Sequence, residues 1–401
     1  MERDIKRREN ETELSYMARM YRNKIELGLN NKEINELINK ELGTHYAEST
    51  TRCNSNSFNQ GYNEALENKN DDEYLKKLEE KTRELEIMKI QYQDQRREYR
   101  NHQRPDARFQ HILDEVKKLI DNLNEIKPFE FTRDCEYIPD DNVEAVLTCS
   151  DWHLFGEVDN YFNKYNIDIA KERLETLLNK TIAYCKFNRV NTLNVELLGD
   201  NIMGGIHWGS KIEASEDTMS QIMDLCEILF LFIHRLCEKI PNVVVRNVIG
   251  NHSRINMDKK NNQNGENLER LVPRALKWRT SGKNHIDNLT IDTQCNIDDT
   301  IIMYDVLGTT IIGLHGDLDK PSDTVNNMVK MFKGVPIDEI HTGHLHHDFV
   351  NEEYDIEYSI NGSLMGVDTY AKSIRKTGSA MQKLRIYTKE GQLCSYKIKL
   401  N

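Results

Sequence analysis

The residues of this sequence best suited to chemistry stand at the ends of apolar runs. Asp151 and His153, two positions apart, follow the apolar run 143–149. Loops at the carboxyl ends of strands are where open α/β sheets build their sites, so this pair is well placed to hold a metal ion. Alone the pair is weak, because Asp-x-His occurs by chance in many chains.

The same arrangement returns four more times along the chain. Later apolar runs end in Gly-Asp at 199–200, Gly-Asn-His at 250–252, His-Gly at 315–316 and Gly-His-x-His at 343–346. A glycine beside the polar residue permits a tight turn and close backbone approach. Each motif alone is more often simple turn chemistry than a site. All five together, made almost wholly of ligand residue types, predict a metal centre.

The order of the five motifs resembles that of the calcineurin-like metallophosphoesterases, over residues 143–401. The run 361–370, Asn-Gly-Ser-Leu-Met-Gly-Val-Asp-Thr-Tyr, further resembles a branch found in phage and prophage proteins and described as DNA-repair-exonuclease-like. The resemblance implies an α/β fold, a four-layer α-β-β-α sandwich of two mixed sheets flanked by helices. Here an all-α N-terminal region would precede it.

Carried over position by position, the resemblance implies a site for two divalent metal ions. The donor types agree, because mixed carboxylate, imidazole and amide sets suit Mn²⁺, Fe²⁺ or Zn²⁺ better than Ca²⁺. Mn²⁺ is the preferred ion, with Fe²⁺, Zn²⁺ and Mg²⁺ as alternatives. A carboxylate can bridge two ions roughly 3.5–4 Å apart. The implied ligands are Asp151, His153 and His346 for the first ion, Asn251, His315 and His344 for the second, and Asp200 as the bridge.

The expected reaction is attack on phosphorus by a water that the two ions deprotonate. His252 adjoins a ligand and is expected to contact the phosphate or protonate the leaving oxygen, or else to support the ligands. Ser253 stands where many members of the family carry an acid, so a group that could orient His252 is absent. Arg254 either clamps a phosphate or forms a surface ion pair.

Other residues near the motifs have weaker claims. His207, in the loop after the bridging aspartate, is a candidate substrate contact. Asp317 and His347 are expected to support the ligands or to lie in loops. Ser363, Tyr370 and Arg375 belong to a run near the site and receive no role.

Strand and helix patterns alternate around the motifs. Strands are predicted over 143–149, 192–198 and 243–249, and helices over 169–187 and 218–239. Such alternation favours an α/β core, in agreement with the implied fold. The enzyme domain is assigned to 141–401.

Residues 1–68 are expected to form a helix-turn-helix-like module. Helical patterns cover 11–27, 33–42 and 47–66, with Asn30 or Asn31 as an N-cap. Residues 1–60 hold ten Lys or Arg and ten Asp or Glu, so the module is not basic, and a small interaction bundle is the alternative to DNA reading. The polar side chains on the third helix that could read a groove are Ser49, Thr50, Thr51, Arg52, Asn54 and Asn56.

Residues 69–140 are expected to form a long helical linker. A seven-residue repeat over 71–104 predicts a helix able to form a coiled coil, and therefore a homo-oligomer, although a solvated single helix is the alternative. Pro105 predicts an interruption, after which the helical pattern resumes over 109–126. The repeat positions are Leu78, Leu85, Tyr92 and Tyr99.

Composition limits the partners. The net charge of −12 argues against a broad non-specific nucleic-acid surface, although a local basic groove is compatible with it. No run of eighteen apolar residues exists, so no membrane span is expected. The eight cysteines are scattered, which suggests free thiols in a reducing cytoplasm, that of the bacterial host if a phage encodes the chain.

The leading expectation is a dinuclear-metal phosphodiesterase that acts as a nuclease with DNA as substrate. Exonuclease and endonuclease action are both open. The first alternative is a phosphatase or a phosphodiesterase of small molecules such as cyclic nucleotides. The second is a non-catalytic DNA-binding scaffold, against which the intact ligand set argues.

Overall fold

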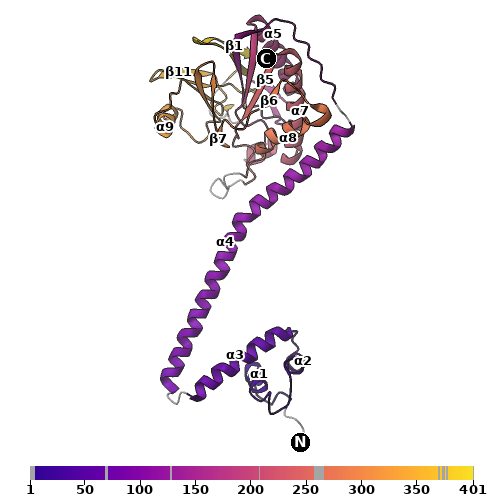
Figure 1. The fold of residues 1–401 in the computed structure, drawn as a ribbon, viewed down its shortest axis with the longest axis vertical. Coiled ribbons are helices and arrows are strands. Elements are labelled where there is room, and N and C mark those ends of the chain that lie inside the picture. The colour runs from indigo at the N-terminus through magenta and orange to yellow at the C-terminus, as the bar shows by residue number, and fades with distance from the viewer. Residues whose placement is uncertain are drawn as a thin grey trace. The chain divides into compact units, whose positions relative to one another are not determined.

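A computed structural model shows two compact units, residues 1–100 and 101–401, with the boundary inside helix α4 (Asp71–Ile126). Figure 1 labels their helices and strands. The described residues are 5–67, 71–126, 129–206, 208–256, 266–368, 371–372, 375 and 378–400. His207 and Tyr370, both singled out in the sequence, therefore lie outside the described residues.

The first unit contains α1 (Glu13–Arg22), α2 (Asn31–Leu42) and α3 (Glu48–Glu67), which confirms the three predicted helices. Asn30 caps α2 in a reciprocal capping box with Glu33, and Gly43 ends the helix at φ 67°. The helices enclose a small core of Tyr16, Met20, Tyr21, Ile34 and Ile38.

The predicted groove-reading face of α3 needs one correction. Thr51 is buried, and its hydroxyl donates to Asn35 Oδ1 at 2.6 Å, so it cannot meet a ligand. It lies on the side of α3 that faces α2, which the polar composition of the helix conceals. The other five predicted side chains are exposed.

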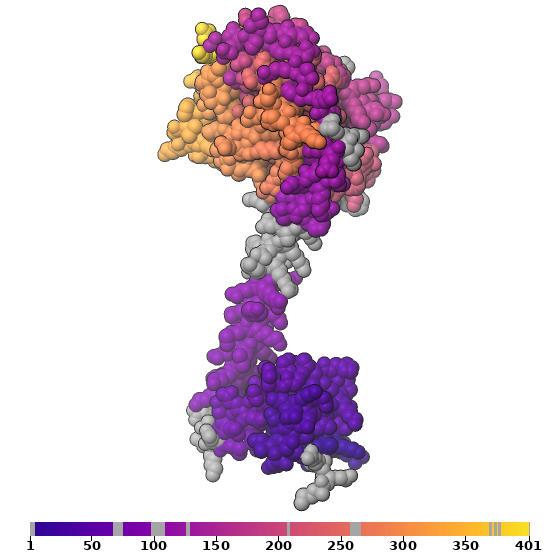
Figure 2. All heavy atoms as spheres, turned by 45° about the vertical axis from the view of Figure 1, so that its right-hand side comes forward, coloured from indigo at the N-terminus to yellow at the C-terminus, as the bar shows by residue number. Residues whose placement is uncertain are grey.

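Helix α4 is continuous, so the interruption predicted at Pro105 is wrong. A proline costs a helix about 3 kcal/mol, and the strong helix formers on both sides of it outweigh that cost here. Before residue 98, Leu78 and Leu85 are 45% and 64% exposed, and Figure 2 shows side chains standing on the surface of this stretch. After residue 108, the apolar face of α4 is buried in the core of the second unit through Phe109, Leu113, Val116 and Ile120.

The second unit holds two six-stranded mixed sheets, as predicted. In the first sheet β1, β4, β5 and β6 pair in parallel, and in the second β9, β10 and β12 do so. Each remaining strand pairs antiparallel with its neighbours. The first sheet has the order β14 (Gly391–Lys399), β13 (Met381–Thr388), β1 (Asp140–Cys149), β4 (Val190–Leu197), β5 (Asn242–Asn247) and β6 (Leu289–Ile291). The second has the order β11 (Phe349–Glu353), β12 (Ile356–Ile360), β10 (Glu339–Thr342), β9 (Thr309–Leu314), β8 (Ile301–Val306) and β7 (Asn296–Asp298).

Helices cover the sheets on separate sides (Figure 1). The helices α5 (Ile167–Phe187), α7 (Thr218–Lys239) and α8 (Val272–Arg279) share a core with the first sheet. The helix α9 (Thr324–Met331) packs Val325 and Met328 on the second sheet. A third apolar cluster, which includes Val146, Leu198 and Ile302, joins the two sheets. The short elements are the hairpin β2 (Val158–Asp159) and β3 (Lys164–Tyr165), and the helices α6 (Trp208–Glu213), η1 (Leu268–Leu271) and η2 (Gly282–Asn284).

This topology brings the motif loops to one edge. The strands β1, β4 and β5 are parallel neighbours, and so are β9 and β10, so the loops that follow them leave each sheet at a shared end. The two sheets meet face to face, which places both sets of loops together. Among the described residues, no helix is both long and apolar enough to cross a membrane.

Candidate metal centre

The backbone at the motifs adopts a conformation that side chains rarely take. Five predicted ligands have positive φ angles: Asp151 (53°), His153 (44°), Asp200 (54°), His344 (66°) and His346 (56°). Each such residue costs of order 1–3 kcal/mol and persists only where its surroundings impose it, typically at functional sites. The loops at the sheet edge therefore hold these five residues in a strained backbone conformation.

The first set of donors joins the β1 loop to the Gly-His-x-His loop. His346 Nε2 lies 3.0 Å from His153 Nε2 and 3.4 Å from Asp151 Oδ1. Asp151 and His153 are buried, and the backbone N–H of His344 donates to Asp151 Oδ2 at 2.9 Å. That hydrogen bond holds the aspartate in place from the neighbouring loop.

The second set surrounds His315. Its Nδ1 donates to the Leu198 carbonyl at 2.8 Å, so in the neutral ring Nε2 carries a lone pair. This Nε2 lies 3.0 Å from Asp200 Oδ2 and 3.2 Å from Asn251 Oδ1. The ligand atoms of Asp200, His315 and His344 all lie within 4.8 Å of one another.

The arrangement fits cations. In the second set the His315 Nε2 lone pair faces the oxygens of Asp200 and Asn251, and such contacts need positive charge between them. In the first set two imidazole nitrogens and a carboxylate oxygen converge on one point. Burial opposes the charge of Asp200, but the histidines around it hold its pKa well below the usual range. Although burial lowers the pKa of His315, Asp200 and Asp151 raise it to about 10. Without a metal ion, a proton on His315 supplies this positive charge. A divalent ion would take its place. The structure therefore brings all seven predicted ligands together.

His252 lies against the same carboxylate. Its backbone N–H donates to Asp200 Oδ1 at 2.7 Å, and its Nδ1 donates to the Met203 carbonyl at 2.7 Å. The ring therefore presents Nε2 to the site, 4.0 Å from Asp200 Oδ2. This contact with a backbone carbonyl fixes the ring without the adjacent acid that the sequence lacks.

Arg254 has partners within the protein. Its Nη2 lies 3.6 Å from Asp317 Oδ2, and its Nε donates to the Asn251 carbonyl at 3.1 Å. Both side chains of the pair are about 15% exposed, so this is a partly buried ion pair rather than a surface one. Ser253, at the position of the missing acid, is fully buried.

Two of the remaining predicted residues, Ser363 and His347, hydrogen-bond to the backbone of the loops. Ser363 donates to the Asp151 carbonyl at 2.8 Å and accepts from the Met365 N–H at 3.0 Å. His347 donates from Nδ1 to the Leu345 carbonyl at 2.8 Å. Arg375 is exposed.

One residue that sequence reasoning missed is Glu269, in η1. Its fully buried carboxylate accepts backbone N–H groups of Gly250 (2.7 Å), Asn201 (2.7 Å) and Asp200 (3.3 Å), and the Asn201 side-chain amide (2.9 Å). Burial raises its pKa, and the charge of Asp200 adds to that. Glu269 therefore ties together the two loops that carry Asp200 and Asn251. No motif marks it, since its partners are distant in sequence.

Two glycines allow these loops to touch. A Cβ on Gly250 would overlap the backbone N and Oδ1 of Asp200, and a Cβ on Gly199 would overlap the backbone of Gly250. Gly199 also has φ 83°. Here the glycines predicted to allow close approach do so.

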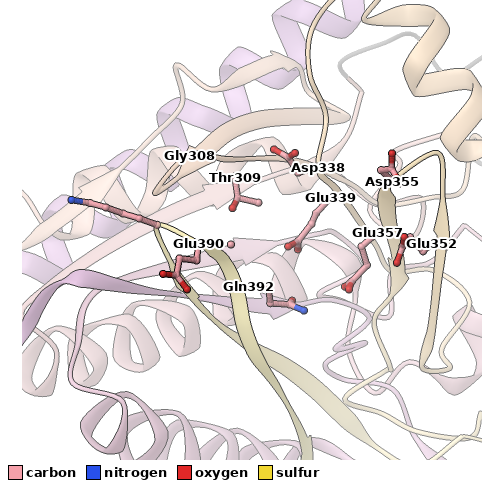
Figure 3. Close-up of a pocket in the computed structure, with 11 residues that line it drawn as sticks. Gly308, Thr309, Asp338, Glu339, Glu352, Asp355, Glu357, Glu390 and Gln392 are labelled. Carbon is pink, nitrogen blue, oxygen red and sulfur yellow. The ribbon is translucent and has the colours of Figure 1, made fainter.

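A hollow of about 390 Å³ lies at the other ends of the same strands (Figure 3). Thr309 and Glu339 line it, and these are the first residues of β9 and β10, whereas the metal-site histidines follow the last residues. Its further acidic lining residues are Asp338, Glu352, Asp355, Glu357 and Glu390. These carboxylates would repel a phosphate, so this hollow does not suit a phosphate ester.

Comparison with known families and sequences finds relatives along the chain. The YonJ N-terminal domain family matches residues 1–71. The SPbeta prophage-derived uncharacterized protein YonJ of Bacillus subtilis (strain 168) is 24% identical over 410 residues, which cover 99% of this chain and 98% of that protein.

Comparison with solved structures finds several matches at low identity. A predicted phosphoesterase from Streptococcus pneumoniae is 12% identical, with a TM-score of 0.28, over 64% of this chain and 97% of its own. An archaeal phosphodiesterase is 13% identical, with a TM-score of 0.31, over 63% and 99%. Vps29 of Entamoeba histolytica, solved with Zn²⁺, is 12% identical, with a TM-score of 0.27, over 64% and 99%.

Proposed function

We propose that this chain is a dinuclear-metal-dependent phosphodiesterase that cleaves DNA. The observation that carries the proposal is the convergence of seven donor side chains from five loops at one sheet edge. The packing of α5, α7 and α8 on one sheet and of α9 on the other supports the four-layer sandwich.

The donors divide between two ions. Asp151, His153 and His346 would hold the first, and Asp200 would bridge to the second. The second set would be completed by Asn251, His315 and His344. When bound, Mn²⁺ or a similar ion supplies Lewis-acid activation of water and neutralises phosphoryl charge.

The chain's own residues would carry the remaining steps. His252 presents Nε2 to the site, and a proton on that atom can pass to the leaving oxygen. The Asp200 carboxylate, which accepts the His252 N–H, keeps that ring beside the residues that would hold the ions. Arg254 stands beside the Asn251 backbone, where its guanidinium can meet a phosphoryl oxygen once the substrate competes with Asp317.

DNA is the proposed substrate, and α3 would help to bind it. The exposed side of α3 presents Ser49, Thr50, Arg52, Asn54 and Asn56. We assign residues 1–68 to substrate reading, 69–140 to a helical linker and 141–401 to catalysis. The prophage-derived relative supports action in the cytoplasm of a bacterial host.

The exposed seam of α4 supports self-association as a second proposal about partners. Leu75, Leu78, Leu85 and Tyr92 are 45–64% exposed at heptad spacing, and a second copy of the same helix would cover them. Sedimentation of wild type beside Leu78→Gln/Leu85→Gln tests this: a dimer should dissociate in the variant, and a monomeric wild type would contradict it.

Hydrolysis assays test the function. Linear single-stranded, linear duplex and circular DNA are compared with bis-p-nitrophenyl phosphate, with Mn²⁺ and with chelator, for wild type and Asp200→Asn. Metal-dependent DNA cleavage that the variant loses is expected, and cleavage of circles would identify an endonuclease. Turnover of the small diester alone would replace the nuclease with a small-molecule phosphodiesterase. No turnover of any substrate would leave a DNA-binding scaffold.

A further inference from the structure

A second hollow, of about 280 Å³, lies at the end of β5, the strand whose following loop carries Asn251. Asn247, the last residue of β5, lines it together with Ile249, which precedes Gly250 and Asn251. Four residues of extended chain span at most about 14 Å, so the hollow and the ligand Asn251 are close neighbours.

The hollow is basic although the chain as a whole is acidic. Arg270, Arg274 and Lys277 line it, with Asp299 as its one acidic residue. Arg270 pairs with Asp299 at 2.9 Å. Within the described part of the chain, Arg274 and Lys277 form no ion pair, and both are exposed. Two positive charges therefore remain for an anionic ligand.

Two of these cations pack against one aromatic ring, which restricts their positions. The guanidinium carbons of Arg270 and Arg274 lie 4.9 and 5.6 Å from the centre of the Phe109 ring, which comes from the buried end of α4. Lys277 is also placed, since its Nζ donates to Thr293 Oγ1 at 3.0 Å. Groups fixed in this way lose less entropy when they bind a ligand.

A buried amide provides an independent sign of a ligand. Asn247 is only 8% exposed, and its Oδ1 has no hydrogen-bond partner among the described residues. The backbone carbonyl of Asn247 is satisfied by Asn296 Nδ2 at 3.0 Å. An unpaired buried polar atom is costly, and a ligand in the hollow that carries both donors and acceptors would satisfy it.

We propose that this hollow binds a backbone phosphate of the nucleic-acid strand whose scissile phosphate lies at the metal centre, with the adjoining nucleotide meeting Asn247. The inference rests on the proposed function. It assigns Arg274 and Lys277 to the affinity for long substrates and gives them no part in the chemical step. The same phosphate chemistry occurs in free mononucleotides, which the experiment separates.

The test compares wild type with Arg274→Gln/Lys277→Gln. The control, Lys171→Gln/Lys330→Gln, removes the same charge from exposed positions on α5 and α9. KM and kcat are measured with Mn²⁺ for a single-stranded oligonucleotide and for bis-p-nitrophenyl phosphate. We expect the oligonucleotide KM to rise about tenfold. The slope of log KM against log salt concentration should become shallower by about 1.4, the effect of two lost phosphate contacts. The kcat, the small diester and the control variant should be unchanged. Equal oligonucleotide KM in wild type and variant would overturn the proposal.

Binding in chelator separates this inference from the proposed function. If wild type cleaves no nucleic acid, the function fails, but anisotropy of a labelled oligonucleotide still tests the hollow. Weaker binding by Arg274→Gln/Lys277→Gln than by its control supports the inference, and equal binding overturns it. The inference would also be overturned if a labelled mononucleotide bound only when both cations are present while oligonucleotide binding did not depend on them. The hollow would then be a nucleotide site.

Discussion

Replacement of Glu269 by glutamine is the most informative single change, because this carboxylate joins two ligand-bearing loops. Oε1 accepts two hydrogen bonds from Asn201, and Oε2 accepts the backbone N–H groups of Gly250 and Asp200. Glutamine keeps the shape and one acceptor oxygen. Its NH₂ group would face N–H donors where the second oxygen was.

The magnitude follows from those contacts. Hydrogen bonds to a charged acceptor contribute about 1.5–3 kcal/mol each, so losing two of them costs about 3–6 kcal/mol. This is a large part of the 5–15 kcal/mol stability of a typical domain, although it is not all of it. Because the loss falls on the loops that carry Asp200 and Asn251, Mn²⁺ affinity should fall even under conditions where the variant is folded.

Urea unfolding and Mn²⁺ calorimetry measure the two effects separately. Glu172→Gln, at an exposed position on α5, is the matched control and should behave as wild type. Glu269→Asp keeps the charge and should recover part of the Mn²⁺ affinity. A glutamine variant with wild-type stability and wild-type Mn²⁺ affinity would refute the role assigned to Glu269.

Three further predictions concern local contacts. Gly250→Ala should lower the melting temperature and Mn²⁺ affinity, because its Cβ would overlap the Asp200 carboxylate, whereas Gly209→Ala, with open space around its Cβ, should not. Arg254→Gln should raise KM for DNA and cost about 1–3 kcal/mol of stability, since it loses a partly buried ion pair with Asp317 and a hydrogen bond to the Asn251 carbonyl; an unchanged KM would reduce this arginine to a structural role. Glu11 has its pKa lowered from 4.5 to about 2, chiefly by hydrogen bonds from Arg19. Because the folded pKa is the lower one, this stabilisation is present above pH 4.5 and is lost as pH falls toward 2. Glu11→Gln should flatten that dependence in urea unfolding followed by circular dichroism, and an unchanged pH profile would contradict the assignment.

Features with local causes could be predicted from the sequence. The cap at Asn30 depends on a residue three positions away, and each ligand motif follows directly from the strand that precedes it. Parallel neighbours then bring the motifs together, so the seven side chains predicted as ligands from the sequence do lie side by side. The continuous helix through Pro105 was missed because a local rule was outweighed by the flanking residues.

Features set by tertiary contact could not be predicted in this way. Glu269 reaches Asp200 and Asn201 across sixty-nine and sixty-eight positions, and nothing in the neighbouring sequence marks it as a buried carboxylate. The burial of Thr51 depends on which side of α3 meets α2. The partner of Arg254 is Asp317, a pairing that only the meeting of the two sheets creates.

The most direct test of the central claim is a count of Mn²⁺ ions per chain, by titration with electron paramagnetic resonance, for wild type and Asp200→Asn. The bridging role proposed for Asp200 predicts two ions in wild type with a spin-coupled signal, and loss of that coupling in the variant. DNA cleavage should rise with the second ion. A single uncoupled ion in wild type, or full coupling in the variant, would contradict the dinuclear site.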